Sequence, residues 1–105
     1  MRKACKENDP ELAKKGWRAF ECFGGKVCLI LKDENGIRGF VNVCPHAGGT
    51  SVPVEEERMG SVLKCQSHGA LFNIISGKAL TPPAPEGSGL RTLGLKVEDG
   101  VIYYQ

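Results

Sequence analysis

Two short cysteine–histidine pairs constrain this 105-residue chain more than any other feature of its sequence. One residue separates Cys44 from His46, and two residues separate Cys65 from His68. These histidines are the only two in the chain, and each stands at a distance from its cysteine that is typical of metal ligands. Glycines accompany both pairs, as expected of loops whose backbone must come close to an inorganic centre. The chain therefore has to fold so that two ligand loops face each other.

Two loops that each supply one thiolate and one imidazole can serve two kinds of metal centre. A [2Fe–2S] cluster fits if Cys44 and Cys65 bind one iron while His46 and His68 bind the other. A mononuclear Cys₂His₂ zinc site uses the same ligands, but zinc modules more often pair cysteine with cysteine and histidine with histidine. The spacing favours the cluster and leaves a structural zinc module as an alternative.

The residues around the two pairs extend the pattern. Cys-Pro-His-Ala-Gly at 44–48 is followed by Cys-Gln-Ser-His-Gly-Ala-Leu-Phe-Asn at 65–73, Ser-Gly-Lys at 76–78 and a proline-rich loop at 81–85. This arrangement resembles the Rieske-type [2Fe–2S] domain. The resemblance implies one cluster and a single domain over residues 1–105. It also implies an antiparallel β-sandwich or incomplete barrel as the base, with a loop-rich cluster-binding subdomain inserted at approximately 43–85.

Within that family, the resemblance points to a low-potential ferredoxin. Respiratory-chain Rieske proteins carry a second cysteine in each loop and join the loops by a disulfide, whereas the corresponding places here are Gly49 and Ser67. They also have serine and tyrosine hydroxyls near the cluster sulfur, where this chain has Ala70 and Phe72. Without those two donors, we expect a potential in the lower half of the range of roughly −150 to +300 mV.

Two further positions depart from the family pattern. Such domains often have a proline directly after the second cysteine and a leucine a few residues beyond the first histidine. This chain has Gln66 and Ser51 at those places. Neither position is a ligand, so the departures concern the shape of the loops.

Length and composition exclude several other classes of protein. A chain this short forms one hydrophobic core. Its 14 basic residues are scattered and are balanced by 12 acidic ones, which gives no support to nucleic-acid binding. No apolar run is long enough to cross a membrane, and the charged N-terminal residues do not resemble a secretory signal. We therefore expect a monomeric cytoplasmic protein without a nucleic-acid or membrane partner.

The pattern along the chain predicts an all-β domain with many turns. Asp9, Pro10 and Gly16 predict one short helix with an aspartate cap and a glycine end. We expect a three-stranded meander followed, near the C-terminus, by a closing hairpin, with strands at residues 17–23, 27–32, 37–43, 93–97 and 101–104. The intervening insertion is expected to consist mainly of loops, with short strands at 61–64 and 71–75.

The other three cysteines are interpreted as thiols of the core or surface. Cys5 lies in a charged terminal stretch, and Cys22 and Cys28 lie in the first predicted hairpin. A longer turn would place Cys22 and Cys28 opposite each other, but a cytoplasmic setting would keep them reduced.

The expected function is one-electron transfer without catalysis, so no catalytic residue is assigned. An oxygenase commonly uses a 2-His-1-carboxylate iron, and the cluster already takes both histidines. The chain also has no Gly-x-Gly-x-x-Gly sequence for a nicotinamide or flavin domain. The resemblance implies a flavoprotein reductase as electron donor and a terminal oxygenase, acting on an organic, aromatic substrate, as acceptor. A small redox subunit of a larger enzyme, such as nitrite reductase, is the alternative within the same fold.

Overall fold

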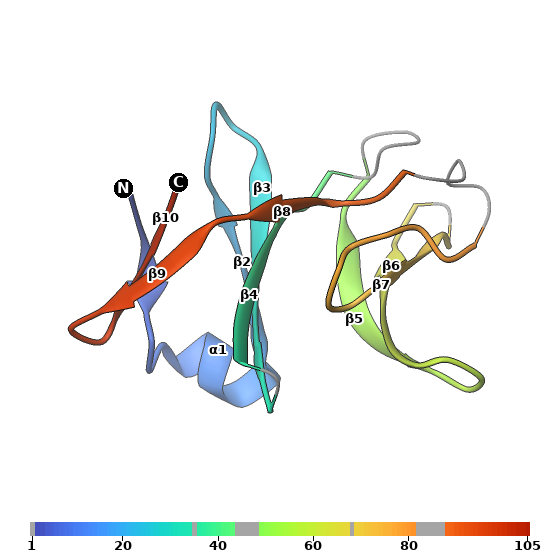
Figure 1. The fold of residues 1–105 in the computed structure, drawn as a ribbon, viewed down its shortest axis with the longest axis horizontal. Coiled ribbons are helices and arrows are strands. Elements are labelled where there is room, and N and C mark those ends of the chain that lie inside the picture. Colours follow the sequence, from blue (N-terminus) through green and yellow to red (C-terminus); the bar gives the residue numbers. More distant parts are fainter. Residues whose placement is uncertain (1, 35, 44–48, 68, 82–87) are drawn as a thin grey trace. The chain divides into compact units, whose positions relative to one another are not determined.

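The computed structural model describes residues 2–34, 36–43, 49–67, 69–81 and 88–105. It divides into two compact units (Figure 1). The first comprises Met1–Val41 together with Thr92–Gln105, and the second comprises Asn42–Arg91. The second unit therefore interrupts the sequence of the first. The predicted insertion at approximately 43–85 falls within it, although the extent of a cluster-binding subdomain stays a prediction.

The first unit is built from antiparallel strands and one short helix. β2, β3 and β4 form the predicted meander, and β9 and β10 form the predicted closing hairpin. The two sheets have the strand orders β1-β10-β9 and β2-β3-β4-β8. Its elements are β1 (Arg2–Lys6), α1 (Pro10–Lys15), β2 (Trp17–Glu21), β3 (Val27–Asp33), β4 (Gly36–Val41), β8 (Arg91–Leu93), β9 (Leu95–Glu98) and β10 (Val101–Tyr104), with β8 starting at the unit boundary.

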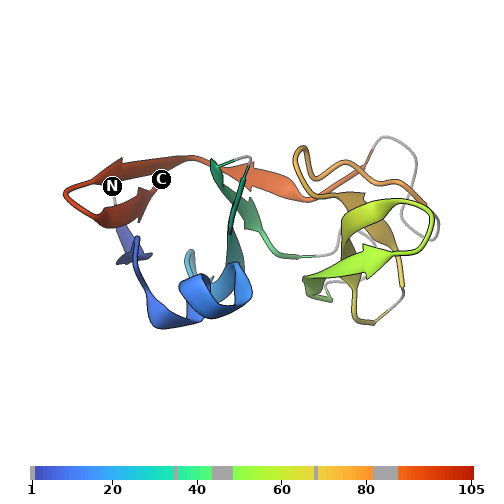
Figure 2. The same cartoon turned by 90° about the horizontal axis from the view of Figure 1, so that it is seen from below.

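The first strand, β1, was not expected from the sequence. It carries three basic residues in five, yet it pairs with β10, so the two ends of the chain lie close together (Figures 1 and 2). Its pairing with β10 covers an edge of the hairpin that would otherwise expose unpaired backbone groups. A polar sequence therefore forms a strand because an existing strand edge provides hydrogen-bond partners.

The short helix α1 forms as predicted. The carboxylate of Asp9 accepts a hydrogen bond from the Leu12 N–H at 3.1 Å and also pairs with Arg18. Gly16 ends the helix with a φ of 80°, which favours glycine. The side chain of Leu12, a residue of this helix, is buried in a cluster with Ile30. In the part of the chain that the structure describes, no helix is long and apolar enough to cross a membrane.

The prediction that Cys22 and Cys28 are reduced thiols is wrong, because they form a disulfide with a Cα–Cα distance of 5.8 Å. The N–H of Cys22 donates to the carbonyl of Lys26, and the N–H of Lys26 donates to the carbonyl of Phe23, which closes a four-residue turn at 23–26 between the strands. Phe20 lies opposite Cys28 in the pairing of β2 with β3. Cys22 follows Phe20 by two residues and is therefore the diagonal neighbour of Cys28 on the same face. The geometry of the hairpin thus brings the two sulfurs together. The prediction of reduced thiols rested on the expected cytoplasmic location.

Cys5 is a buried thiol, as the sequence suggested. It packs in the cluster that contains Leu12, Ile30 and Ile102. Burial raises the pKa of the Cys5 thiol, and the nearby carboxylate of Asp9 raises it further. The thiol therefore stays protonated near neutral pH.

The second unit contains a three-stranded antiparallel sheet in the order β5-β6-β7. The strands are β5 (Ser51–Glu56), β6 (Gly60–Cys65) and β7 (Leu71–Asn73). β6 and β7 were predicted, whereas β5, which contains Pro53 and two glutamates, was not. β5 lies at the edge of the sheet, where a proline without an N–H is tolerated.

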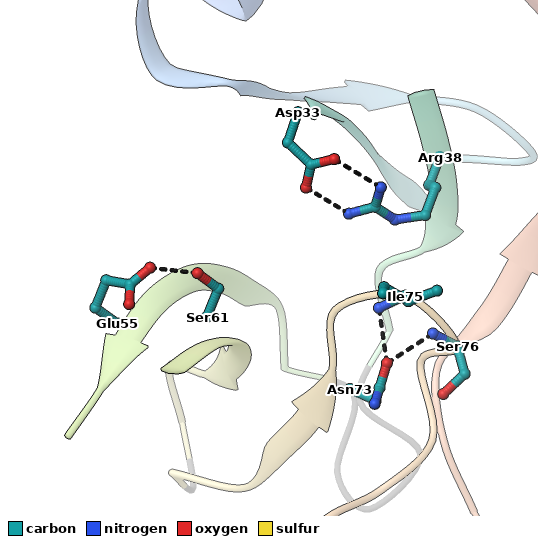
Figure 3. A network of polar contacts seen from close by, with 7 residues as sticks. All are labelled: Asp33, Arg38, Glu55, Ser61, Asn73, Ile75 and Ser76. Atoms are coloured by element: carbon teal, nitrogen blue, oxygen red, sulfur yellow. Dashed lines mark hydrogen bonds and ion pairs between the residues drawn. The ribbon is translucent and has the colours of Figure 1, made fainter. Parts of the chain in front are cut away.

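Side-chain hydrogen bonds define the ends of several strands (Figure 3). The hydroxyl of Ser61 donates to Glu55 across β5 and β6. Asn73 accepts from the N–H groups of Ile75 and Ser76 at 2.8 and 2.9 Å, which turns the chain at the end of β7. The predicted strand at 71–75 is therefore two residues too long.

Candidate metal centre

One of the four predicted metal ligands lies among the described residues. Cys65 is the last residue of β6, and only 1% of its surface is exposed. Cys44, His46 and His68 lie outside the described residues, as do residues 82–85 of the proline-rich loop. Among the described residues, no group of three or more histidines, cysteines and acids could hold a metal ion. The ligand set therefore stays a prediction, and the surroundings of Cys65 are the part of the site that can be analysed.

Backbone hydrogen bonds hold Cys65 at the start of a tight loop. Its N–H donates to the carbonyl of Ala70 at 2.8 Å, and its carbonyl accepts from the N–H of Gly69 at 2.9 Å. Gly69 has a φ of 77°, a conformation that other residues adopt at a cost. Beyond the loop, the N–H of Leu71 donates to the hydroxyl of Thr81 at 3.0 Å. The second ligand loop is thus closed by its own backbone.

The end of the first ligand loop lies directly against the second. A Cβ atom added to Gly49 would be 3.2 Å from the Cys65 sulfur, 2.6 Å from the Ser67 hydroxyl oxygen and 3.0 Å from the Ser67 Cβ. Only a residue without a side chain leaves room for this approach. Gly49 and Ser67 also correspond, by resemblance, to the disulfide cysteines of respiratory-chain proteins, and the structure places these two positions next to each other.

The base of the first loop is closed by a buried asparagine. The Asn42 side-chain amide donates to the Ser51 carbonyl at 2.8 Å, and its oxygen accepts from the Ser51 N–H, also at 2.8 Å. Only 2% of Asn42 is exposed. This double contact joins Asn42, two residues before Cys44 in the sequence, to the first residue of β5. Asn42 was not identified from the sequence. The one sign of its role there is that a polar side chain stands between two valines, Val41 and Val43.

Ser51 is fully buried, and its hydroxyl has no hydrogen-bond partner among the described residues. It lies opposite Cys65 in the pairing of β5 with β6. Ala70 and Phe72 are both buried, and the loss of two donors to cluster sulfur at these positions stays a prediction. A buried thiol, a close backbone approach and an unpartnered hydroxyl together fit a sulfur-rich inorganic centre at this end of the sheet.

Comparison with known families identifies this centre. The family model described as the Rieske [2Fe-2S] domain matches residues 3–97. The chain belongs to this family. A Rieske domain contains one [2Fe–2S] cluster, and this decides between the cluster and the zinc module in favour of the cluster. The predicted all-β Rieske fold is likewise confirmed.

Solved structures agree with the fold of this Rieske domain. A chain in a complex of reduced oxygenase and oxidised ferredoxin in carbazole 1,9a-dioxygenase matches with a TM-score of 0.74 and 19% identity, covering 97% of this chain and 89% of that one. The ferredoxin of carbazole 1,9a-dioxygenase from Nocardioides aromaticivorans matches with a TM-score of 0.69 and 19% identity, covering 99% and 94%. These similarities concern the fold.

A curated relative is much longer than this Rieske domain. The cytidine monophosphate-N-acetylneuraminic acid hydroxylase of Cricetulus griseus is 29% identical over 59 residues, which are 56% of this chain. The match spans only 10% of the hydroxylase. What the hydroxylase does as a whole is therefore not transferred to this chain.

Proposed function

We propose that this Rieske domain is a one-electron carrier whose cluster is bound by Cys44 and Cys65 on one iron and by His46 and His68 on the other. The observation that supports this most directly is the contact of Gly49 with Cys65, since it brings the end of one ligand loop to the ligand of the other. When bound, the cluster supplies the uptake and release of one electron. The chain holds it between two loops closed by hydrogen bonds and contributes no catalytic group.

The proposed electron donor is a flavoprotein reductase, and the proposed acceptor is a terminal oxygenase that hydroxylates an aromatic compound. A structure of similar fold contains a ferredoxin in complex with the oxygenase of carbazole 1,9a-dioxygenase, and this supports the choice of acceptor. We further propose that the protein acts as a monomer in the cytoplasm. The Cys22–Cys28 disulfide is more typical of oxidising compartments, so the redox state of this pair in the cell tests the location.

A second candidate function is that of a redox module in a larger enzyme. The length of the hydroxylase relative favours it, since there a similar segment accounts for a tenth of the protein. Purification from the native source separates the two candidates. A carrier is recovered as an independent small protein, whereas a module is recovered attached to, or stably associated with, a larger catalytic partner.

The cluster assignment can be tested with two buried cysteines as a matched pair. Cys65 is a proposed ligand, and Cys5 is a buried thiol of the first unit. Iron, acid-labile sulfide, visible absorption and the EPR spectrum after dithionite reduction should be measured for Cys65→Ser and Cys5→Ser. We expect two irons, two sulfides and an axial signal in the wild-type protein and in Cys5→Ser, and loss of all three in Cys65→Ser. Zinc in place of iron, or a cluster retained in Cys65→Ser, would contradict the proposal.

A further inference from the structure

Among the described residues of the second unit, the Ser51 hydroxyl is the one buried side-chain polar group without a hydrogen-bond partner. Ser51 has no exposed surface, and among the described residues its oxygen has no hydrogen-bond partner. Burying a hydroxyl without a hydrogen-bond partner destabilises the folded protein. This destabilisation is smaller if the cluster-loaded protein supplies an acceptor for the hydroxyl.

The strand register places this hydroxyl on the same side of the sheet as the Cys65 sulfur. Ser51 and Cys65 are directly opposite each other in the pairing of β5 with β6. The N–H of Gln66 donates to the carbonyl of Thr50 at 2.9 Å, just beyond the pair. The backbone groups of Ser51 bond to Asn42 instead of to β6. This is the non-hydrogen-bonded type of antiparallel pair, in which the Cβ atoms lie about 4.5–5.5 Å apart.

The side chains next to Ser51 and Cys65 on this face of the sheet offer no other acceptor. Pro53 and Leu63 form the next pair along β5 and β6, and Leu63 lies opposite Phe72 of β7. Leu63 and Phe72 are fully buried. Phe72 also stands where respiratory-chain proteins have a tyrosine hydroxyl. Glu55 and Ser61 form the following pair on this face, at the far end of β5 and β6, where Ser61 donates to Glu55. Among the described side chains next to Ser51 on this face, the Cys65 sulfur is therefore the one atom that can accept a hydrogen bond.

We propose that Ser51 is a positioning residue whose hydroxyl donates a hydrogen bond to sulfur at the cluster, either the Cys65 thiolate or a bridging sulfide. This inference rests on the proposed function, because it requires Cys65 to be a ligand. A donor to sulfur stabilises the reduced cluster, which carries more negative charge, and thereby raises the potential. Ser51 partly replaces the two donors that are missing at Ala70 and Phe72.

The test compares Ser51→Ala with Ser61→Ala, which removes a hydroxyl from the far end of β6. For Ser51→Ala we expect the visible and EPR spectra of a Rieske cluster and an equilibrium constant for reduction about tenfold smaller, which is about 59 mV in voltammetry. Ser61→Ala should keep the wild-type potential. The cluster-free Ser51→Ala protein should unfold at no lower urea concentration than the cluster-free wild type, because the hydroxyl has no partner there.

The outcomes separate the two proposals. A wild-type protein without a [2Fe–2S] spectrum refutes the proposed function itself. An intact spectrum with the same potential in Ser51→Ala and Ser61→Ala overturns the role of Ser51 and leaves the carrier function standing. A cluster-free Ser51→Ala protein that is clearly destabilised also overturns it, since this shows a structural role. If Ser51→Ala binds no cluster, Ser51→Thr decides: a wild-type potential supports the hydroxyl contact, and a tenfold change in the equilibrium constant contradicts it.

Discussion

Replacing Gly49 by alanine should loosen the cluster site by separating its two loops. The added Cβ would lie 2.6 Å from the Ser67 hydroxyl oxygen, 3.0 Å from the Ser67 Cβ and 3.2 Å from the Cys65 sulfur. The hydroxyl can rotate away, but the Ser67 Cβ can move only with the loop, and a Cys65 sulfur bound to the cluster cannot rotate away. Inserting one carbon into a packed site of this kind costs about 1–3 kcal/mol. Gly49 has no positive φ, so this cost comes from the lack of space and not from the backbone conformation.

The assay is urea unfolding of the cluster-loaded protein, followed by visible absorption and iron release. Gly49→Ala should lower the free energy of unfolding by about 2 kcal/mol and speed the loss of iron. Gly94→Ala is the matched control, because a Cβ there would be 3.4 Å from the nearest atom, the Cγ of Gln105, and should change stability by less than about 0.5 kcal/mol.

A second substitution shows whether crowding between the loops is the cause. Ser67→Gly removes two of the three atoms that the new Cβ would contact. In the Gly49→Ala background it should recover about 1 kcal/mol, since contacting residues couple in double-mutant cycles. If Gly49→Ala behaves like Gly94→Ala, or if Ser67→Gly brings no recovery, the two loops do not meet as described.

Three further predictions concern the framework of the fold. Replacing both Cys22 and Cys28 by alanine should lower the free energy of unfolding by about 2 kcal/mol without changing the cluster spectrum, and reduction of the wild-type protein should match this in urea unfolding. Asn42→Leu should cost about 2–4 kcal/mol, because two buried backbone groups of Ser51 lose their partners; an unchanged urea midpoint would contradict this. Asp9→Ala should cost about 1 kcal/mol through loss of the helix cap, measured by thermal unfolding, and a neutral result would show that the cap is dispensable.

Local signals in the sequence were sufficient to predict many of the secondary-structure elements. The cap, proline and glycine around α1 act within a few residues of each other, and the closing hairpin follows from alternating apolar residues around Asp99-Gly100. Both turn residues have positive φ, as a tight two-residue hairpin turn requires. In contrast, β1 and β5 form because a partner strand is present. Their own residues, basic in one case and proline-containing in the other, do not favour a strand.

The candidate site shows the same division between local and long-range information. The spacing of cysteine and histidine is a local signal, and it predicts the ligands Cys44, His46, Cys65 and His68. The groups that shape the site come from pairings over longer distances: Asn42 with Ser51 across the first loop, Ser51 with Cys65 across two strands, and Gly49 with Ser67 between the loops. None of these pairings has a signature in spacing, because each depends on a strand register or a loop contact that only the folded chain provides. The departure of Ser51 from the family pattern was visible in the sequence, and only the register shows that the departure puts a hydroxyl opposite Cys65.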